Sequence, residues 1–170
     1  IIASDPLFVT DSTSLTKQWY LPKIQIPDAW AETTGGSVIV AVVDTGIDAL
    51  HEDLNDGRVG KGFKSYCQTI NSANPEQCLT RITGEIPAGI NSDDNGHGTV
   101  VAGIIGAVPN NNKGISGINW NVRLMPIKVL DSEGTGFTSD LALGIKWAAD
   151  NGAKIINLSI GGKGLSGAEV

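Results

Sequence analysis

The fold of this chain is decided by residues 37–48, which read SVIVAVVDTGID. Positions 38–43 form an uninterrupted apolar run that is rich in β-branched residues, and Gly35 and Gly36 precede it. A run of this length and type is typical of a parallel strand that is buried on both faces. Such a strand needs helices to cover it, so we expect an α/β fold.

Two segments have the helical spacing of apolar residues that would provide this cover. The first opens at His97 and extends to residue 105, and the second runs from Ser139 to Asn151. A short apolar run follows each of them, at residues 122–129 and 153–158. Because strands and helices alternate, the sequence predicts a doubly wound α/β domain with a mostly parallel sheet and helices on both faces.

The composition is that of an ordinary globular domain, with 41% hydrophobic and 18% charged residues among 170. This length predicts a single domain, in which residues 1–35 form a polar N-terminal arm with a short amphipathic piece at 28–31, and residues 36–170 form the α/β core. No stretch approaches the roughly 18 apolar residues of a membrane span. The net charge of −6, with scattered basic residues, argues against nucleic acid as a partner.

The two cysteines, Cys67 and Cys78, lie in a polar segment at residues 65–80 that has neither helical nor strand periodicity. We interpret this segment as a surface loop that a disulfide closes, with two free thiols as the alternative. Zinc is disfavoured because both histidines lie elsewhere and the sequence has no second cysteine pair. A disulfide requires an oxidising compartment, so we expect a secreted, extracellular protein. Since the sequence opens at Ile1 without a signal-type stretch, we expect that any targeting segment or pro-segment has been removed or lies outside it.

Asp44 comes directly after the predicted central strand, where ligands gather in open parallel sheets. Taken alone, an aspartate in this place is more often a turn residue that hydrogen bonds its own backbone. The DTG of residues 44–46 also occurs in aspartic proteases, but their chemistry needs two carboxylates that share a proton, and the sequence has no second copy. Asp44 alone therefore leaves both readings open.

A histidine between two glycines opens the first predicted helix, in the stretch DDNGHGTVVAG at residues 93–103. The glycines would let a substrate backbone approach the imidazole, and the helix would fix the ring. A neutral imidazole can take a proton from a nucleophile when a carboxylate holds its other nitrogen. We therefore expect His97 and Asp44 within hydrogen-bond reach of each other at the carboxyl edge of the sheet.

These motifs resemble the subtilisin-like serine protease family, the subtilases. VDTGID at residues 43–48 and NGHGT at residues 95–99 look like the family's Asp and His signatures. The motifs WY, KIQ and AW within residues 19–30 resemble the N-terminal arm of the thermitase-like branch, and NLSIGG at residues 157–162 resembles the family's substrate-binding strand. The resemblance implies a serine-type endopeptidase that acts on polypeptides, with its own pro-segment as a further possible partner.

The resemblance also implies roles for individual residues. His97 would be the general base and then the general acid, while Asp44 would hold its tautomer and stabilise the imidazolium. Two glycine-containing segments would sandwich the substrate main chain. Their residues are Gly134, Thr135, Gly136, Ser159, Ile160 and Gly161. The alternative is that their glycines form simple turns.

A structural calcium ion is a further implication of the resemblance. Mixed carboxylate, amide and carbonyl oxygens suit Ca²⁺. The ligands would be the side chains of Asp5, Asp53 and Asn111 and the carbonyls of Val108, Lys113 and Ile115. The alternative is an Asn-rich surface turn near two solvated aspartates.

The sequence departs from the family pattern at Val100 and lacks two of its features. Val100 replaces a usual second histidine, and we expect it to pack rather than react, while His51 matches a structural histidine. The segment GTSMA with the nucleophilic serine, and the asparagine that would donate to the oxyanion, do not occur. We therefore expect the N-terminal part of one catalytic domain, truncated on its C-terminal side, with the serine beyond Val170 and no activity of these residues alone.

Three hypotheses remain for the function. The chain is part of an active protease, part of a non-catalytic subtilase-like binding module, or an unrelated α/β ligand-binding domain. Four motifs in the family's order argue against the third, and the intact Asp44 and His97 favour the first over the second.

Overall fold

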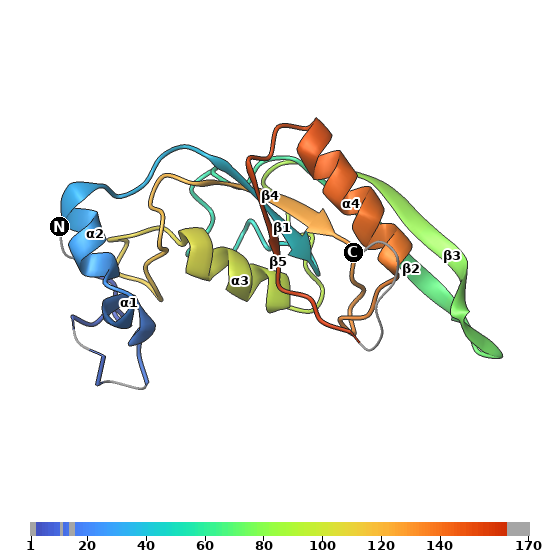
Figure 1. The fold of residues 1–170 in the computed structure, drawn as a ribbon, viewed down its shortest axis with the longest axis horizontal. Coiled ribbons are helices and arrows are strands. Elements are labelled where there is room, and N and C mark those ends of the chain that lie inside the picture. Colours follow the sequence, from blue (N-terminus) through green and yellow to red (C-terminus); the bar gives the residue numbers. More distant parts are fainter. Residues whose placement is uncertain (1–2, 11, 14–15, 163–170) are drawn as a thin grey trace.

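The computed structural model describes residues 3–10, 12–13 and 16–162, and its centre is one five-stranded sheet with strand order β3-β2-β4-β1-β5 (Figure 1). The strands are β1 (Ile39–Asp44), β2 (Gly62–Asn71), β3 (Asn74–Ile86), β4 (Arg123–Lys128) and β5 (Ile155–Leu158). The helices are α1 (Tyr20–Lys23), α2 (Ile26–Glu32), α3 (His97–Gly106) and α4 (Thr138–Asp150). All strand pairs are parallel except β2 with β3.

The strand β1 pairs with β4 on one side and with β5 on the other, and its successive side chains point to opposite faces of the sheet. Val42 belongs to a buried cluster with Ala102 of α3, whereas Val43 lies on the face that packs against Ala148 of α4. Figure 1 shows the two helices on opposite sides of the sheet. The doubly wound α/β fold expected from the sequence is therefore confirmed.

The N-terminal arm packs at one end of the molecule through α2. Trp30 is buried, and its indole Nε1–H donates to the carbonyl of Ile118 at 2.9 Å. Its ring also lies 4.9 Å, between centroids, from the ring of Trp120. The amphipathic piece expected at residues 28–31 is thus part of a helix that ties the arm to the segment before β4. No helix in the described ranges has the length and hydropathy of a membrane span.

The interpretation of residues 65–80 as a loop was wrong. These residues lie in β2, β3 and the turn between them, which form an antiparallel hairpin that extends away from the rest of the sheet (Figure 1). Most of β3 is exposed, and the register of the pair shifts three times between Cys67 and Asn71. Apart from Ser65 and Cys67, residues 65–80 are partly or fully exposed, so their sequence needs no alternation of apolar and polar residues, which is the signal of a strand.

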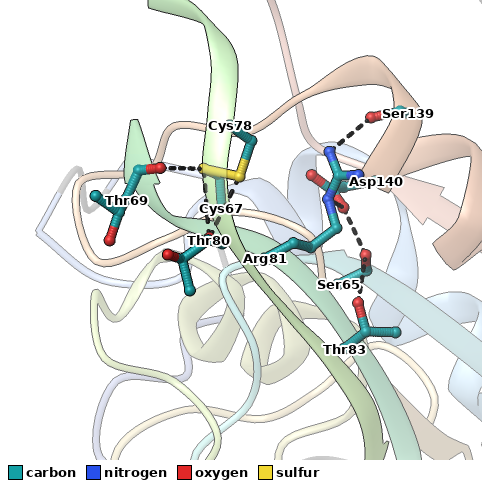
Figure 2. The surroundings of a disulfide bond; sticks show 9 residues. All are labelled: Ser65, Cys67, Thr69, Cys78, Thr80, Arg81, Thr83, Ser139 and Asp140. Carbon is teal, nitrogen blue, oxygen red and sulfur yellow. Dashed lines mark hydrogen bonds and ion pairs between the residues drawn. A yellow bond between two sulfur atoms is a disulfide. The ribbon is translucent and has the colours of Figure 1, made fainter. Parts of the chain in front are cut away.

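The disulfide expected between Cys67 and Cys78 is present and links the two strands of this hairpin, with a distance of 5.7 Å between the two Cα atoms (Figure 2). Nearer the sheet, Arg81 Nε of β3 lies 2.9 Å from Oδ1 of the fully buried Asp140 in α4. Ser65 Oγ of β2 donates to the same oxygen at 2.5 Å. Both strands of the hairpin are therefore anchored on the first turn of α4.

This arrangement predicts that the disulfide stabilises the outer part of the hairpin only. In a variant with Cys67→Ser and Cys78→Ser, opening of the hairpin should become easier by about 2–3 kcal/mol, the value of the chain-entropy model for a loop of this size. Hydrogen exchange should accelerate in residues 68–80 and stay unchanged in β1 and β4. Protection of residues 68–80 equal to that of the oxidised protein would contradict the prediction.

Candidate active site

Asp44 and His97 meet at the carboxyl edge of the parallel strands, because Asp44 ends β1 and His97 begins α3. His97 Nδ1 lies 2.9 Å from Oδ1 and 2.9 Å from Oδ2 of Asp44. The carboxylate is fully buried, while 51% of the imidazole side chain is exposed. The contact expected from the sequence is therefore present. The carboxylate of Asp44 lies inside the protein, and the imidazole of His97 is open to solvent.

This geometry sets what the imidazole can do. A carboxylate that accepts the Nδ1–H leaves a lone pair on Nε2, so this nitrogen can accept a proton from another group. Across residues 3–10, 12–13 and 16–162, no hydroxyl group forms a hydrogen bond with Nε2. The pair is thus an oriented base whose reacting nitrogen has no nucleophile beside it in this part of the chain.

Glycine is favoured at the two positions beside His97 for different structural reasons. A Cβ on Gly98 would lie 2.1 Å from the carbonyl oxygen of Gly46 and 3.2 Å from Cβ of Asp44. Gly96 has φ of 107°, a left-handed conformation that disfavours residues with a side chain. The sequence suggested that both glycines make room for a substrate. Gly98 instead lets the first turn of α3 approach the end of β1.

Asp93 holds this first turn in place, a role that the sequence analysis did not assign. Its Oδ2 accepts the backbone N–H of Thr99 at 3.0 Å, and its Oδ1 accepts the backbone N–H of Gly96 at 2.9 Å. Oδ1 also accepts the hydroxyl of Thr45 at 2.8 Å, and that hydroxyl accepts the N–H of Gly98 at 3.0 Å. Asp93 and Thr45 together therefore join the end of β1 to the start of α3.

The same contacts determine the ionisation of Asp93. Burial on its own would raise the pKa of this carboxyl group, but the hydrogen bonds outweigh it, so the pKa lies below its ordinary value. Because the pKa is lowered by folding, the carboxylate stabilises the loop above the ordinary aspartate pKa. That contribution is lost as the pH falls through the lowered pKa. An acidic residue a few positions before a helix is the signal that could have identified it.

The two segments expected to bind substrate lie on either side of a cleft next to His97. The cleft has a volume of about 330 Å³, and His97 lines it together with Gly134, Ser159, Ile160 and Gly161. Gly136 lines an adjoining apolar pocket of about 550 Å³ instead, which Ile160 and Gly161 share. Thr135 lines neither, since its backbone N–H and C=O both bond to Asp131.

The expected calcium ligands Asp5 and Asp53 are brought together, although both side chains serve as hydrogen-bond acceptors. The backbone N–H of Asn111 donates to Asp5 Oδ1 at 3.0 Å, and its side-chain Nδ2 donates to Asp53 Oδ1 at 2.9 Å. The N–H of Ile115 donates to Asp53 Oδ2 at 2.9 Å. The two aspartates are only 4% and 3% exposed, so the alternative of solvated surface aspartates is wrong. The hydrogen-bond donors to them in the described part of the chain are all neutral.

The other calcium candidates lie in the same region with other contacts. Val108 donates its N–H to the carbonyl of Asp53 at 2.8 Å, and Lys113 extends its side chain to Glu52. No cluster of three or more His, Cys, Asp or Glu side chains suited to a metal occurs within the described ranges. A site here would therefore depend on two carboxylates, the amide of Asn111 and backbone carbonyls.

Two further expectations concern single residues of the motifs. The Nδ1 atom of His51 lies 3.2 Å from the backbone nitrogen of Asp53 and accepts its N–H, which agrees with a structural role. Val100 was expected to pack, but it is 62% exposed, so this prediction was wrong for the described part of the chain. It lies on the outward side of α3, where no described element covers it.

Comparisons with known proteins agree with these motifs. Residues 35–169 of this chain match the model of the subtilase family. Thermitase from Thermoactinomyces vulgaris is 36% identical over 159 residues, which are 94% of this chain and 48% of thermitase. The cell wall-associated protease of Bacillus subtilis (strain 168) is 43% identical over 125 residues, which are 73% of this chain and 12% of that protein.

A solved structure has the same fold. Fervidolysin from Fervidobacterium pennivorans, a keratinolytic enzyme related to subtilisin, superposes with a TM-score of 0.71 at 35% identity, over 99% of this chain and 24% of fervidolysin. The chain therefore spans less than half the length of these relatives. Since the match to the family extends from four residues before β1 to beyond β5, this chain belongs to the subtilase family.

Proposed function

We propose that this chain supplies the aspartate and the histidine of a serine-type endopeptidase. The observation that carries the proposal is the bond between His97 Nδ1 and both oxygens of the buried Asp44, at 2.9 Å, with the ring open to a cleft. A degenerate binding module would have no need of an oriented base, so the intact pair favours catalysis over that second candidate. The relatives are proteases by name.

In the proposed reaction, Nε2 of His97 accepts the proton of a serine hydroxyl while the serine oxygen attacks the carbonyl carbon of the scissile peptide bond. Asp44 keeps the proton on Nδ1 and stabilises the imidazolium that forms. The imidazolium then gives its Nε2 proton to the leaving amine, and an acyl-enzyme remains. A water molecule repeats the two proton transfers and releases the acid.

We infer that the nucleophilic serine belongs to a segment of the protein outside these 170 residues. No described hydroxyl bonds to Nε2, and the sequence has no GTSMA segment of the kind expected for it. The substrate would be an extended polypeptide between residues 134–136 and 159–161, because these segments flank the cleft and their glycines permit close backbone approach.

Secretion and binding of a pro-segment belong to the same proposal. The disulfide of the hairpin supports an oxidising, extracellular location. The name of the cell wall-associated relative agrees with it. A pro-segment would act as a further polypeptide partner at the same cleft.

We also propose that Asp5, Asp53 and Asn111 hold a structural Ca²⁺, with carbonyls of Val108, Lys113 and Ile115 completing the ligands. Two buried carboxylates face the same loop and receive only neutral donors from the described residues, and a cation between them would offset the several kcal/mol that burying such charges costs. The mixed oxygen ligands suit Ca²⁺. The ion would supply charge balance and no step of the reaction.

The proposal of function predicts covalent labelling at one serine. The protein with all of its segments should hydrolyse a chromogenic peptide, and a serine-reactive phosphonate should label a serine outside residues 1–170. His97→Ala should abolish turnover and labelling, since no base would remain to activate the serine. Residues 1–170 expressed alone should show neither. Labelling of Ser159 or Ser166 in the short chain would contradict the proposal, because the nucleophile would then lie within it.

The assignment of Asp44 predicts a loss confined largely to kcat. Asp44→Asn should lower kcat about 10⁴-fold, a magnitude that is taken from serine proteases with the same triad, because an amide favours the wrong imidazole tautomer. Asp48→Asn is the matched control, since Asp48 lies in the same motif and, among the described residues, its side chain bonds only the backbone N–H of Leu50. It should stay within about twofold of wild type. A loss below about tenfold in Asp44→Asn would refute the role of Asp44.

The calcium proposal predicts that a chelator lowers the thermal midpoint of the intact protein. An ion that binds only the folded state at 100 times its Kd contributes about 2.7 kcal/mol. Asp53→Ala should remove most of the response to chelator. Asp56→Ala, which changes an exposed aspartate paired with Arg58, should keep the wild-type response. An undiminished response in Asp53→Ala would exclude this set of ligands.

A further inference from the structure

We propose that Lys128 is a positioning residue for the proposed hydrolysis, because its buried ammonium fixes the three chain segments that form the site relative to one another. The inference rests on the proposed function of Asp44 and His97. It concerns a residue at the end of β4 that makes no contact with the imidazole and acts through the groups it bonds.

Lys128 lies directly beside Asp44 in the sheet, as its register partner between β4 and β1. Its side chain is only 4% exposed. The Nζ atom donates to the carbonyl of Thr45 at 2.8 Å, to Asp94 Oδ1 at 2.6 Å and to the carbonyl of Leu130 at 2.9 Å. An ammonium group has three N–H donors, so each one has an acceptor.

The three acceptors belong to three different parts of the site. Thr45 follows Asp44 in the chain, and Asp94 lies in the loop three residues before His97. Leu130 begins the segment at residues 130–136, and it lines the cleft together with His97 and Gly134. One nitrogen atom therefore contacts the carboxylate segment, the histidine segment and the proposed substrate segment. Asp93 and Thr45 link only the first two.

The surroundings of the ammonium leave it little freedom. The ring of Tyr66 in β2 lies with its centroid 4.7 Å from Nζ, which adds a cation–π contact on a further side. Burying a charged group is costly, and an ion pair in such a place is a weak source of stability. A gain in stability therefore explains this lysine poorly. The burial of Lys128 is better explained by its three hydrogen bonds, which fix the positions of the three segments relative to one another.

The test compares Lys128→Met and Lys128→Arg with Lys146→Met in the protein with all of its segments. Methionine keeps the length of the side chain but has no donor. Arginine keeps the charge, but its planar guanidinium cannot aim three donors from one nitrogen. Lys146 is an exposed lysine of α4 that pairs with Asp150 at 2.6 Å, and it serves as the control. Each variant is titrated with a serine-reactive phosphonate, so that kcat refers to active molecules only.

Both Lys128 variants should lower kcat per titrated site about 10- to 100-fold, the size of loss expected when reacting groups move by about 1 Å. KM should rise by a few fold, because Leu130 begins the substrate segment. Lys146→Met should match wild type. A residue that only stabilises the fold would lower the titrated fraction and leave kcat per site unchanged, and this result would overturn the inference. Wild-type kcat in Lys128→Arg would overturn it as well, since charge alone would then suffice.

A spectroscopic measurement separates this inference from the proposed function. The Nδ1 proton between His97 and Asp44 should give a low-field proton resonance in wild type and in Lys146→Met. This resonance should shift or broaden in Lys128→Met if the lysine positions the pair. If wild type shows the resonance but no turnover, the proposed function fails while the spectrum still decides the role of Lys128. An unchanged resonance together with unchanged kcat would refute that role.

Discussion

Burying a carboxylate is costly, and the interior position of Asp44 is the constraint on which this site depends. The cost of burying such a charge is several kcal/mol unless hydrogen bonds compensate it. Here the compensation comes from the backbone N–H of Thr45 at 2.7 Å and from the imidazole of His97. The Thr45 donor is the next residue in the chain, but the imidazole reaches Asp44 only if the end of β1 and the start of α3 are held together. Compensation of the Asp44 charge therefore depends on the loop after β1, on the loop before α3 and on α3 itself.

The remaining structure meets this requirement through close backbone approach and shared hydrogen bonds. Gly98 permits contact between α3 and the end of β1 that any side chain would prevent. Asp93 satisfies N–H groups of the first turn of α3, which would otherwise lack partners. The carbonyl of Asp44 also accepts the N–H groups of Val129 and Leu130, at 2.9 and 3.2 Å. The residue is thus fixed by its backbone as well as by its side chain.

The sequence predicted those parts of the structure whose signals are local. The apolar run at residues 38–43 indicated β1, the helical spacing indicated α3 and α4, and the motifs around Asp44 and His97 indicated their contact. The hairpin of β2 and β3 was missed because its outer part is largely exposed on both faces and therefore carries no periodic pattern. Lys128 was missed because the sequence does not distinguish a buried lysine at the end of an apolar strand from an exposed one. Its burial depends on Asp94 and Leu130, whose position relative to β4 only the fold determines.

The hairpin has a consequence for a protein that cuts polypeptides, as this one is proposed to do. A protease whose cleft accepts extended chains could also cleave its own long exposed segments, because a flexible loop could enter the cleft as a substrate. In the hairpin, antiparallel pairing uses the main-chain groups that a cleft would have to bond, and the link between Cys67 and Cys78 keeps either strand from separating. The contacts of Arg81 and Ser65 with Asp140 hold the base of the hairpin in the same way. In a protease of the proposed kind, these contacts would make the hairpin between the two motifs a poor substrate for its own cleft.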